Sequence, residues 1–254
     1  MGMAANPITA VVLLLLSILA APPPVSAKLK TTTISFNTFT FSDPLKVNPP
    51  ATISNDALQV TPDTGNTAAA SSLLANQSGR ILFDTPFQLW EGKNDTFSDR
   101  VASFNASFLV NIFRLKDSPT PGEGLTFVVA PDLNLPLNSS GEYLGLTNAT
   151  TDGNASNQIL AVELDTFQED FDPDANHVGL NINSVRSNKT TSLTPLLVGP
   201  NQTANFFNVW VQYDGVKKVI YGPFISAFTS PCRKMLWTNL WSLNLIQCVH
   251  GRAV

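Results

Sequence analysis

Short segments rich in β-branched and aromatic residues follow one another along this chain, separated by clusters of Pro, Gly, Asn, Asp and Ser. No window shows sustained helical periodicity, whereas alternation with a period of two, the pattern of strands, recurs. We expect strands within residues 31–41, 79–90, 101–113, 124–131, 158–167, 177–185 and 206–221. Many strands at short intervals indicate an all-β fold, an antiparallel sandwich rather than alternating strands and helices.

The amino-terminal segment predicts export from the cell. An apolar run from Val11 to Ala21 is short for a membrane span, and prolines at 22–24 end it. Small residues up to Ala27 then suit cleavage by a signal peptidase. We therefore expect residues 1–27 to be a signal peptide, with a retained amino-terminal anchor as the less favoured alternative.

Eight Asn-x-Ser/Thr sequons agree with a secreted, extracellular and N-glycosylated protein. They are Asn76, Asn94, Asn105, Asn138, Asn148, Asn154, Asn188 and Asn201. No later apolar stretch is long enough to cross a bilayer, so we expect no membrane span in the mature chain.

Charge and length limit the partners and the domain count. The formal net charge is −4 without a basic patch, which argues against nucleic acid or an anionic membrane as a partner. The residues after the leader suffice for one large β domain or two small ones. Both cysteines, Cys232 and Cys248, lie close to the carboxyl end, where they could pair with each other.

Residues 161–185 combine a strand pattern with six acidic residues and one of the two histidines in the chain. Glu163 and Asp165 share one strand face because side chains alternate along a strand. If the next expected strand pairs with this one as a hairpin, His177 joins them on the outer face, at the loop end. The connecting loop 168–176 is long and rich in oxygen ligands.

Such a constellation favours a metal site over a solvated acidic loop. Three carboxylates and one imidazole suit a transition ion such as manganese or zinc. Oxygen-only ligands, including a backbone carbonyl, suit calcium. Asp165 and Asp172 could bridge the two ions. Each residue alone is more simply explained as part of a solvated turn, but the combination is not.

These residues carry a family resemblance. The stretch "AVELDTF…DP…HVGLNINSVRS" resembles the metal-binding signature of the legume (L-type) lectins and of lectin-like plant receptor kinase ectodomains. Further motifs occur in the family's order: "ISF", "SGRILF", "VASFNASF", "GLTFVVAP", "YLGLTN" and "VWVQYDG". The resemblance extends from about residue 31 to 220 and implies a concanavalin-like jelly-roll sandwich that holds one transition ion, such as Mn²⁺, and one Ca²⁺.

The resemblance also implies residue roles. It places the transition-metal ligands on Glu163, Asp165, Asp172 and His177. It places the calcium ligands on Asp165, the carbonyl of Phe167, Glu169 and Asp172. The spacings match the family's without a gap, and only position 169 departs from its residue types.

The saccharide-binding positions depart further from the family. Glu123 stands where the family has an Asp, Gly141 lies near the position of its Gly, and Glu169 replaces its calcium-bound Asn. An Asn can bind calcium through its oxygen and still donate an N–H to a sugar hydroxyl, whereas an ionised Glu only accepts. Phe167 is a candidate for stacking against a sugar face. Ion binding is therefore expected to tolerate these changes better than sugar binding.

The carboxyl-terminal segment differs from the family pattern. From residue 222 onward no stretch resembles the family's final core strands, and the segment reads neither as a strand nor as a helix. We therefore predict three parts: a signal peptide (1–27), a legume-lectin-like sandwich (28–221) that lacks its last strands, and a divergent tail (222–254).

The leading functional hypothesis is a secreted carbohydrate-binding module without catalysis, whose loops are organised by Ca²⁺ and a transition ion. Glycans are the expected partners, and self-association is compatible with this fold. One alternative is a degenerate lectin-like domain that binds an apolar ligand or a protein. A laminarinase-type glycoside hydrolase is disfavoured, because Glu169 lies six residues after Glu163, beyond the strand end.

Overall fold

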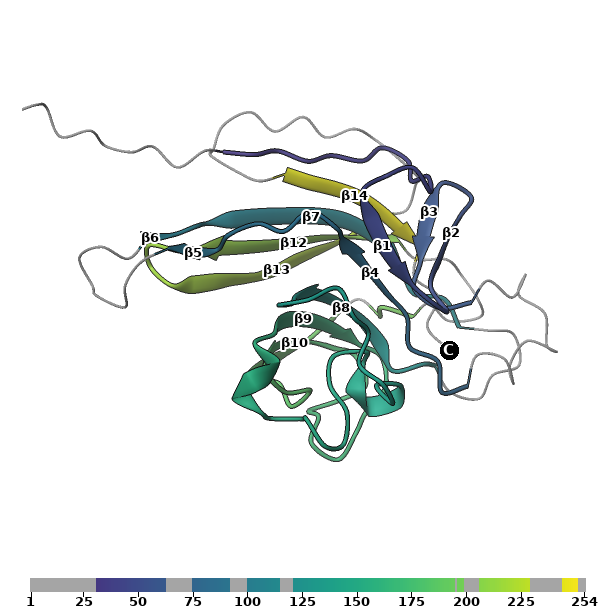
Figure 1. The fold of residues 1–254 in the computed structure, drawn as a ribbon. Coiled ribbons are helices and arrows are strands. Elements are labelled where there is room, and N and C mark those ends of the chain that lie inside the picture. The colour runs from purple at the N-terminus through teal and green to yellow at the C-terminus, as the bar shows by residue number, and fades with distance from the viewer. Residues whose placement is uncertain are drawn as a thin grey trace, which may run out of the picture. The chain divides into compact units, whose positions relative to one another are not determined.

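The computed structural model describes residues 31–62, 75–91, 100–114, 121–194, 196–198, 206–228 and 244–250. Its larger sheet has six strands in the order β13-β12-β7-β14-β3-β2 (Figure 1). These strands are β2 (Thr52–Ser54), β3 (Ala57–Gln59), β7 (Phe104–Asn111), β12 (Phe206–Asp214), β13 (Val219–Phe228) and β14 (Asn244–His250). All-β architecture, expected from the periodicity of the sequence, is confirmed.

A second sheet has four antiparallel strands in the order β11-β10-β9-β8. They are β8 (Gly124–Val129), β9 (Leu160–Asp165), β10 (His177–Ile182) and β11 (Lys189–Ser192). Two further sheets have two antiparallel strands each. They are β1 (Leu45–Asn48) with β4 (Arg80–Phe83), and β5 (Trp90–Glu91) with β6 (Arg100–Val101).

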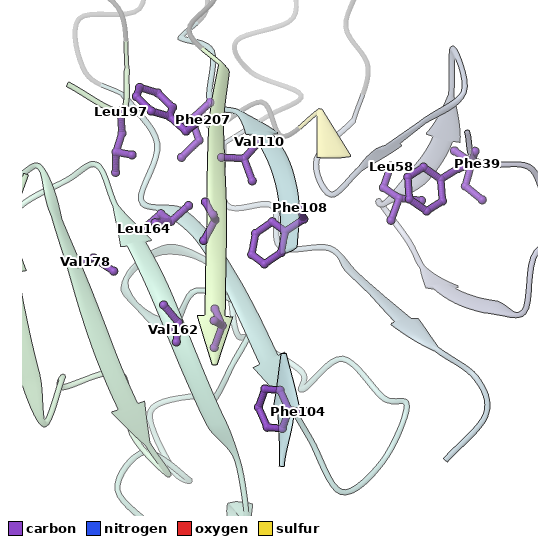
Figure 2. Close-up of a cluster of buried hydrophobic side chains, with 14 residues drawn as sticks. Phe39, Leu58, Phe104, Phe108, Val110, Val162, Leu164, Val178, Leu197 and Phe207 are labelled. Carbon is purple, nitrogen blue, oxygen red and sulfur yellow. The ribbon is translucent and has the colours of Figure 1, made fainter. Parts of the chain in front are cut away.

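The main hydrophobic core lies between the two larger sheets. Alternate residues of β7 and β12 point into it, among them Val110, Phe207 and Val209, all at most 1% exposed. Val162 and Leu164 of β9 belong to the same cluster (Figure 2). The period of two that predicts strands from the sequence thus also selects the residues that form this core.

The opposite face of β9 packs under a second, smaller cluster. Ala161 lies there with Leu146, Ile159 and Val185, and all four are buried. Both faces of β9 are therefore covered, one by the main core and the other by loops. This cover explains why acidic residues on the second face are also buried.

Two sequence-based expectations are wrong. Residues 31–41 contain no strand, although their composition favours one. A strand needs a ladder of hydrogen bonds to a neighbouring strand, whereas Phe39 N–H donates to the carbonyl of Asp56, which lies in a turn. The tail from residue 222, expected without regular structure, contributes the second half of β13 and all of β14. The expected boundary after residue 221 falls inside β13.

Strand β14 differs from the other named strands in the direction of its pairing. It pairs with β7 and β3 in parallel, whereas the other named pairings are antiparallel. Cys248 lies in β14, while Cys232 lies outside the described residues, so their pairing stays a prediction. Residues 1–27, the predicted signal peptide, also lie outside the described residues. Within the described residues, no helix is long and apolar enough to cross a membrane.

Candidate metal and saccharide site

Strand register brings the predicted metal ligands together. In the pairing of β9 with β10, His177 lies opposite Asp165, and Gly179 lies opposite Glu163. The side chains of Glu163, Asp165 and His177 point to the same face, the one covered by the smaller cluster. They are 1%, 6% and 0% exposed, so the sequence identifies the face but not its burial.

The potential ligand atoms of these three residues lie within 4.8 Å of one another. His177 Nε2 lies 3.3 Å from Glu163 Oε1. The loop supplies a fourth group, because Asp172 Oδ1 lies 3.9 Å from the same nitrogen. All four residues to which the resemblance assigns the transition ion therefore border one small buried space.

The histidine is held in the orientation that a ligand needs. Its Nδ1 lies 2.8 Å from the carbonyl oxygen of Asp174 and donates to it. This bond directs Nε2 toward the carboxylates, where it is buried and forms no hydrogen bond despite the proximity of Glu163. A metal-ligating histidine characteristically donates its other ring N–H in this way. The donor set therefore fits a transition ion.

Two side chains fix Glu163 through hydrogen bonds to its carboxylate. Its Oε2 accepts from Asn181 Nδ2 at 2.8 Å, and its Oε1 accepts from Ser187 Oγ at 2.5 Å. Gly179 lets these groups approach, because a Cβ at this position would lie 1.9 Å from Ser187 Oγ and 2.1 Å from Glu163 Oε1. Partners of this kind orient a ligand and tune its basicity.

Local hydrogen bonds shape the loop that carries the proposed calcium ligands. Asp165 Oδ1 accepts from Phe167 N–H at 2.8 Å, and Asp172 Oδ2 accepts from Glu169 N–H at 2.9 Å. Each carboxylate thus keeps one oxygen for an ion. The calcium ligand set, which adds the Phe167 carbonyl and the Glu169 carboxylate to Asp165 and Asp172, stays a prediction.

The buried charges shift the protonation of the cluster. Burial, followed by the charges of Asp172 and Glu163, raises the pKa of Asp165 to about 8. Burial lowers the pKa of His177, but the Glu163 carboxylate 3.3 Å away, the Asp174 carbonyl and the charge of Asp165 outweigh it and raise this pKa to about 9. Such shifts are expected where several acids share a buried space, and a bound cation would reverse them.

The predicted saccharide residues lie near this cluster: before β8, in a short 3-10 helix (η2, Gly141–Tyr143), and in the loop after β9. Glu123 precedes β8, and its carbonyl accepts from the N–H of Thr166 at 3.0 Å, which ties this loop to the end of β9. Glu123 and Gly141 line the same small cavity of about 150 Å³. Gly141 has φ of +66° and open space where a Cβ would stand.

A third acidic residue, Glu142, lies close enough to Glu123 and Glu169 to affect their pKa values. Burial first, and the charges of Glu169 and Glu142 second, raise the pKa of Glu123 to about 7. The pKa of Glu169 is also raised, by burial and then by Glu142. The predicted saccharide positions thus form an acidic surface with Glu142, which the sequence indicates at Glu123 and Glu169 but not at Glu142.

Sequence reasoning also missed the residues that support the metal cluster. Asn181 has a usable signal, because it shares a face with His177 and is polar in an otherwise apolar strand. Asp174, which binds His177 through its backbone carbonyl, gives no side-chain signal for this role. Ser187 gives no periodic signal, because it reaches Glu163 from the segment between β10 and β11.

The comparison with protein families is decisive for the chain as a whole. The legume lectin domain family matches residues 31–249, which include most of the tail as well as both sheets.

The chain belongs to the legume lectin domain family.

Legume lectins and lectin receptor kinases are among its relatives. A probable L-type lectin-domain containing receptor kinase, S.5, of Arabidopsis thaliana is 38% identical over 170 residues, which are 65% of this chain and 24% of the kinase. A lectin of Glycine max is 38% identical over 51% of this chain and 41% of its own length. The chain thus spans less than half of these two relatives. A basic agglutinin of Psophocarpus tetragonolobus is 31% identical over 76% of this chain and 72% of its own.

Solved structures agree with the fold. Lectin UEA-II, complexed with galactose, has a TM-score of 0.58 at 27% identity, covering 77% of this chain and 81% of that one. Winged bean acidic lectin, complexed with methyl-α-D-galactose, has a TM-score of 0.59 at 29% identity, covering 78% and 81%. The predicted legume-lectin jelly roll is therefore confirmed.

Proposed function

We propose that this legume lectin domain is a secreted carbohydrate-binding module whose saccharide loops are organised by divalent cations. The observation that carries the proposal is the buried cluster of Glu163, Asp165, Asp172 and His177, in which His177 Nε2 lies beside the carboxylates without a hydrogen bond. Relatives of this fold were solved with galactose-type sugars, which supports a saccharide ligand.

The cations would act on structure and not on chemistry. A transition ion such as Mn²⁺ would be held by these four residues, and Ca²⁺ by Asp165, Asp172, Glu169 and the Phe167 carbonyl. Since Asp172 and Glu169 lie in the loop between β9 and β10, filling both sites would fix this loop against β9 and β10. Loop order would in turn fix the saccharide surface formed with Glu123 and Gly141.

A saccharide would meet hydrogen-bond acceptors at Glu123 and Glu169 and a backbone N–H at Gly141, with Phe167 available for stacking. Sugar hydroxyls donate as well as accept, so an acidic surface selects ligands that present donors. Each such bond contributes roughly 0.5–1.5 kcal/mol net, so the altered pattern should favour sugars different from those of lectins with an Asn at this position.

A hydrolytic function is disfavoured by burial. A retaining glycosidase needs two carboxyl groups that flank a substrate bond. Glu163 is 1% exposed, and two hydrogen bonds orient it away from solvent, so a polysaccharide could not reach it. These features suit a ligand of a buried ion and support the proposal that the domain is not an enzyme.

Export with removal of residues 1–27, and N-glycosylation, belong to the same proposal. The sequence features that support them are the apolar leader and the eight sequons. Glycans are the proposed partners; nucleic acid is not.

A glycan array with the mature protein, with and without a chelator, tests the function. We expect binding to a limited set of glycans, lost on chelation and restored by Ca²⁺ together with Mn²⁺. Binding that is indifferent to the chelator would contradict ion-organised recognition. An array without signal under either condition, from protein shown to hold its ions, would contradict carbohydrate binding itself.

A further inference from the structure

The sequon that begins at Asn76 borders the proposed saccharide site. Asn76 lines the same cavity of about 150 Å³ as Glu123 and Gly141, although it is distant from both in the sequence. The residue is exposed, so Asn76 stands where the cavity opens to solvent. A sequon on the surface can accept an N-glycan. Its position at the mouth of this cavity gives such a glycan a specific neighbourhood.

Direct contacts hold this sequon against the loop that carries Gly141. Ser78, the third residue of the sequon, has its Oγ 3.2 Å from Ser139 Oγ, and the two hydroxyls share a hydrogen bond. On the other side of the loop, a Cβ at Gly145 would lie 3.8 Å from Ser78 Cβ. The sequon therefore packs beside the saccharide loop before and after Gly141.

The strand that follows the sequon strengthens this attachment. Arg80, the first residue of β4, is 6% exposed, and its guanidinium donates to the carbonyl oxygens of Asn134 and Gly145. These two carbonyls lie before and after Gly141 in the sequence, so one buried side chain holds both ends of the loop. A group attached to Asn76, shortly before Arg80, therefore stays close to the cavity.

The small size of the cavity makes its rim important. Pockets that enclose a small organic ligand usually have about 300–1,000 Å³. This cavity has about 150 Å³, so an oligosaccharide would place only part of its length inside. The remainder would extend over the rim, where Asn76 stands. Whatever is attached to Asn76 would then compete for space with the larger ligands.

We propose that Asn76 carries an N-glycan that restricts access to the saccharide site, a regulation that rests on the function proposed above. The donor is a lipid-linked oligosaccharyl pyrophosphate. The bond from its anomeric carbon to the pyrophosphate oxygen breaks, a bond to Asn76 Nδ2 forms, the amide loses one proton and the lipid pyrophosphate leaves. An N-glycan is bulky and hydrophilic, so it excludes branched oligosaccharides more strongly than monosaccharides.

Shielding is measurable on the secreted chain without any saccharide. Glycopeptide mass spectrometry first determines whether Asn76 carries a glycan. Hydroxyl-radical footprinting then follows Leu144, which is half-buried and lines the cavity. We expect severalfold faster oxidation of Leu144 in Asn76→Gln than in the wild type, and equal oxidation of Val216, which is 87% exposed and outside the lining. An unmodified Asn76, or equal oxidation of Leu144, overturns the proposal.

An array of monosaccharides and branched oligosaccharides, with Ca²⁺ and Mn²⁺ present, connects shielding with recognition. We expect Asn76→Gln to bind branched oligosaccharides at least about tenfold more tightly than the wild type, and monosaccharides with a smaller gain. Asn188→Gln is the matched control and should bring no gain, because this exposed sequon does not line the cavity. Equal affinity of the wild type and folded Asn76→Gln for branched oligosaccharides overturns the proposal.

Enzymatic trimming of the glycans to a single N-acetylglucosamine tests the same idea without a substitution. This second route is needed because Asn76 has φ of +54°, which Asn tolerates better than Gln. Trimming should strengthen binding of branched oligosaccharides by the wild type and bring no further gain in Asn76→Gln.

The two proposals fail in different ways. An array without signal for all forms, with Leu144 shielded in the wild type, contradicts carbohydrate binding and supports the Asn76 glycan as a cover of this cavity. Binding that is equal in all forms supports carbohydrate binding and contradicts the cover.

Discussion

At the residue scale, His177 connects fold and proposed function. Its ring is fully buried, its Nδ1 is used by the Asp174 carbonyl, and its Nε2 is left without a hydrogen bond beside three acids. An uncompensated polar atom in such a position destabilises the fold unless a proton or a cation occupies the space. An ion bound as proposed would therefore replace protons held by the cluster.

This exchange predicts a pH dependence. The raised pKa values of Asp165, about 8, and His177, about 9, mean that the ion-free folded chain holds protons that the unfolded chain has released. The stability of chelated protein should therefore fall as pH rises from about 4 to about 9. Since bound ions replace these protons, Mn²⁺ with Ca²⁺ should raise the melting temperature more at about pH 8 than at about pH 5. Thermal melts at both pH values, with and without ions, check this; an equal or larger increase at the lower pH contradicts it.

Glu169 gives a second prediction at this scale. Replacing it by the family's amide, Glu169→Asn, supplies an N–H donor and removes one charge from the acidic surface that raises the pKa of Glu123. We expect affinity for the best monosaccharide of the array to rise about tenfold, consistent with one added hydrogen bond. Glu169→Gln, which adds the donor on a longer side chain, is the matched control and should give less. Titration calorimetry with ions present measures both, and an unchanged or lower affinity for Glu169→Asn contradicts the role of this position.

At the element scale, the β9–β10 hairpin positions the metal cluster, and Gly179 is its tightest point. Gly179→Ala would push the new methyl group against Glu163 Oε1 and Ser187 Oγ. We expect a loss of about 1–3 kcal/mol in the free energy of unfolding and a clear loss of Mn²⁺ affinity.

Gly153→Ala separates these two effects. Gly153 has φ of +77°, but a Cβ there meets nothing within 4 Å. This control should lower stability through backbone strain and leave Mn²⁺ affinity unchanged. Calorimetric Mn²⁺ titrations and chemical denaturation of both variants provide the comparison; normal Mn²⁺ affinity in Gly179→Ala would show that the glycine does not support the cluster.

The positions of the sequons in the fold predict which of them carry glycans. Asn105 lies within β7 between β12 and β14, and its Oδ1 is buried. Asn138, Asn154 and Asn188 are exposed. Glycopeptide mass spectrometry of secreted protein should find these three sites occupied and Asn105 unmodified. A glycan at Asn105 in folded material would contradict the placement of this residue.

At the scale of the whole molecule, sequence patterns predict the sandwich and the hairpin well, for a physical reason. Alternation fixes which side chains share a face, so the meeting of Glu163, Asp165 and His177 follows once β9 and β10 pair. Burial of these residues does not follow, because the loops that cover them have no periodic signal. Residues such as Leu146 and Val185 reveal their role only in the folded chain.

The structure of the carboxyl-terminal segment could not be predicted from the sequence. Parallel pairing of β14 with β7 joins residues about 140 apart in the sequence, and nothing local specifies such a contact. The position of Asn76 beside Glu123 and Gly141 could not be predicted either, because the walls of their cavity come from segments far apart in the sequence.

Native mass spectrometry of the gently purified chain tests the central claim most directly. We predict two divalent ions per folded chain, removed by chelator and regained from Mn²⁺ and Ca²⁺. Glu163→Gln should lose the transition ion, whereas Asp56→Asn, a carboxylate-to-amide change in an exposed turn with φ of +59°, should keep both ions. A folded chain that carries no ion and takes up none would contradict the account.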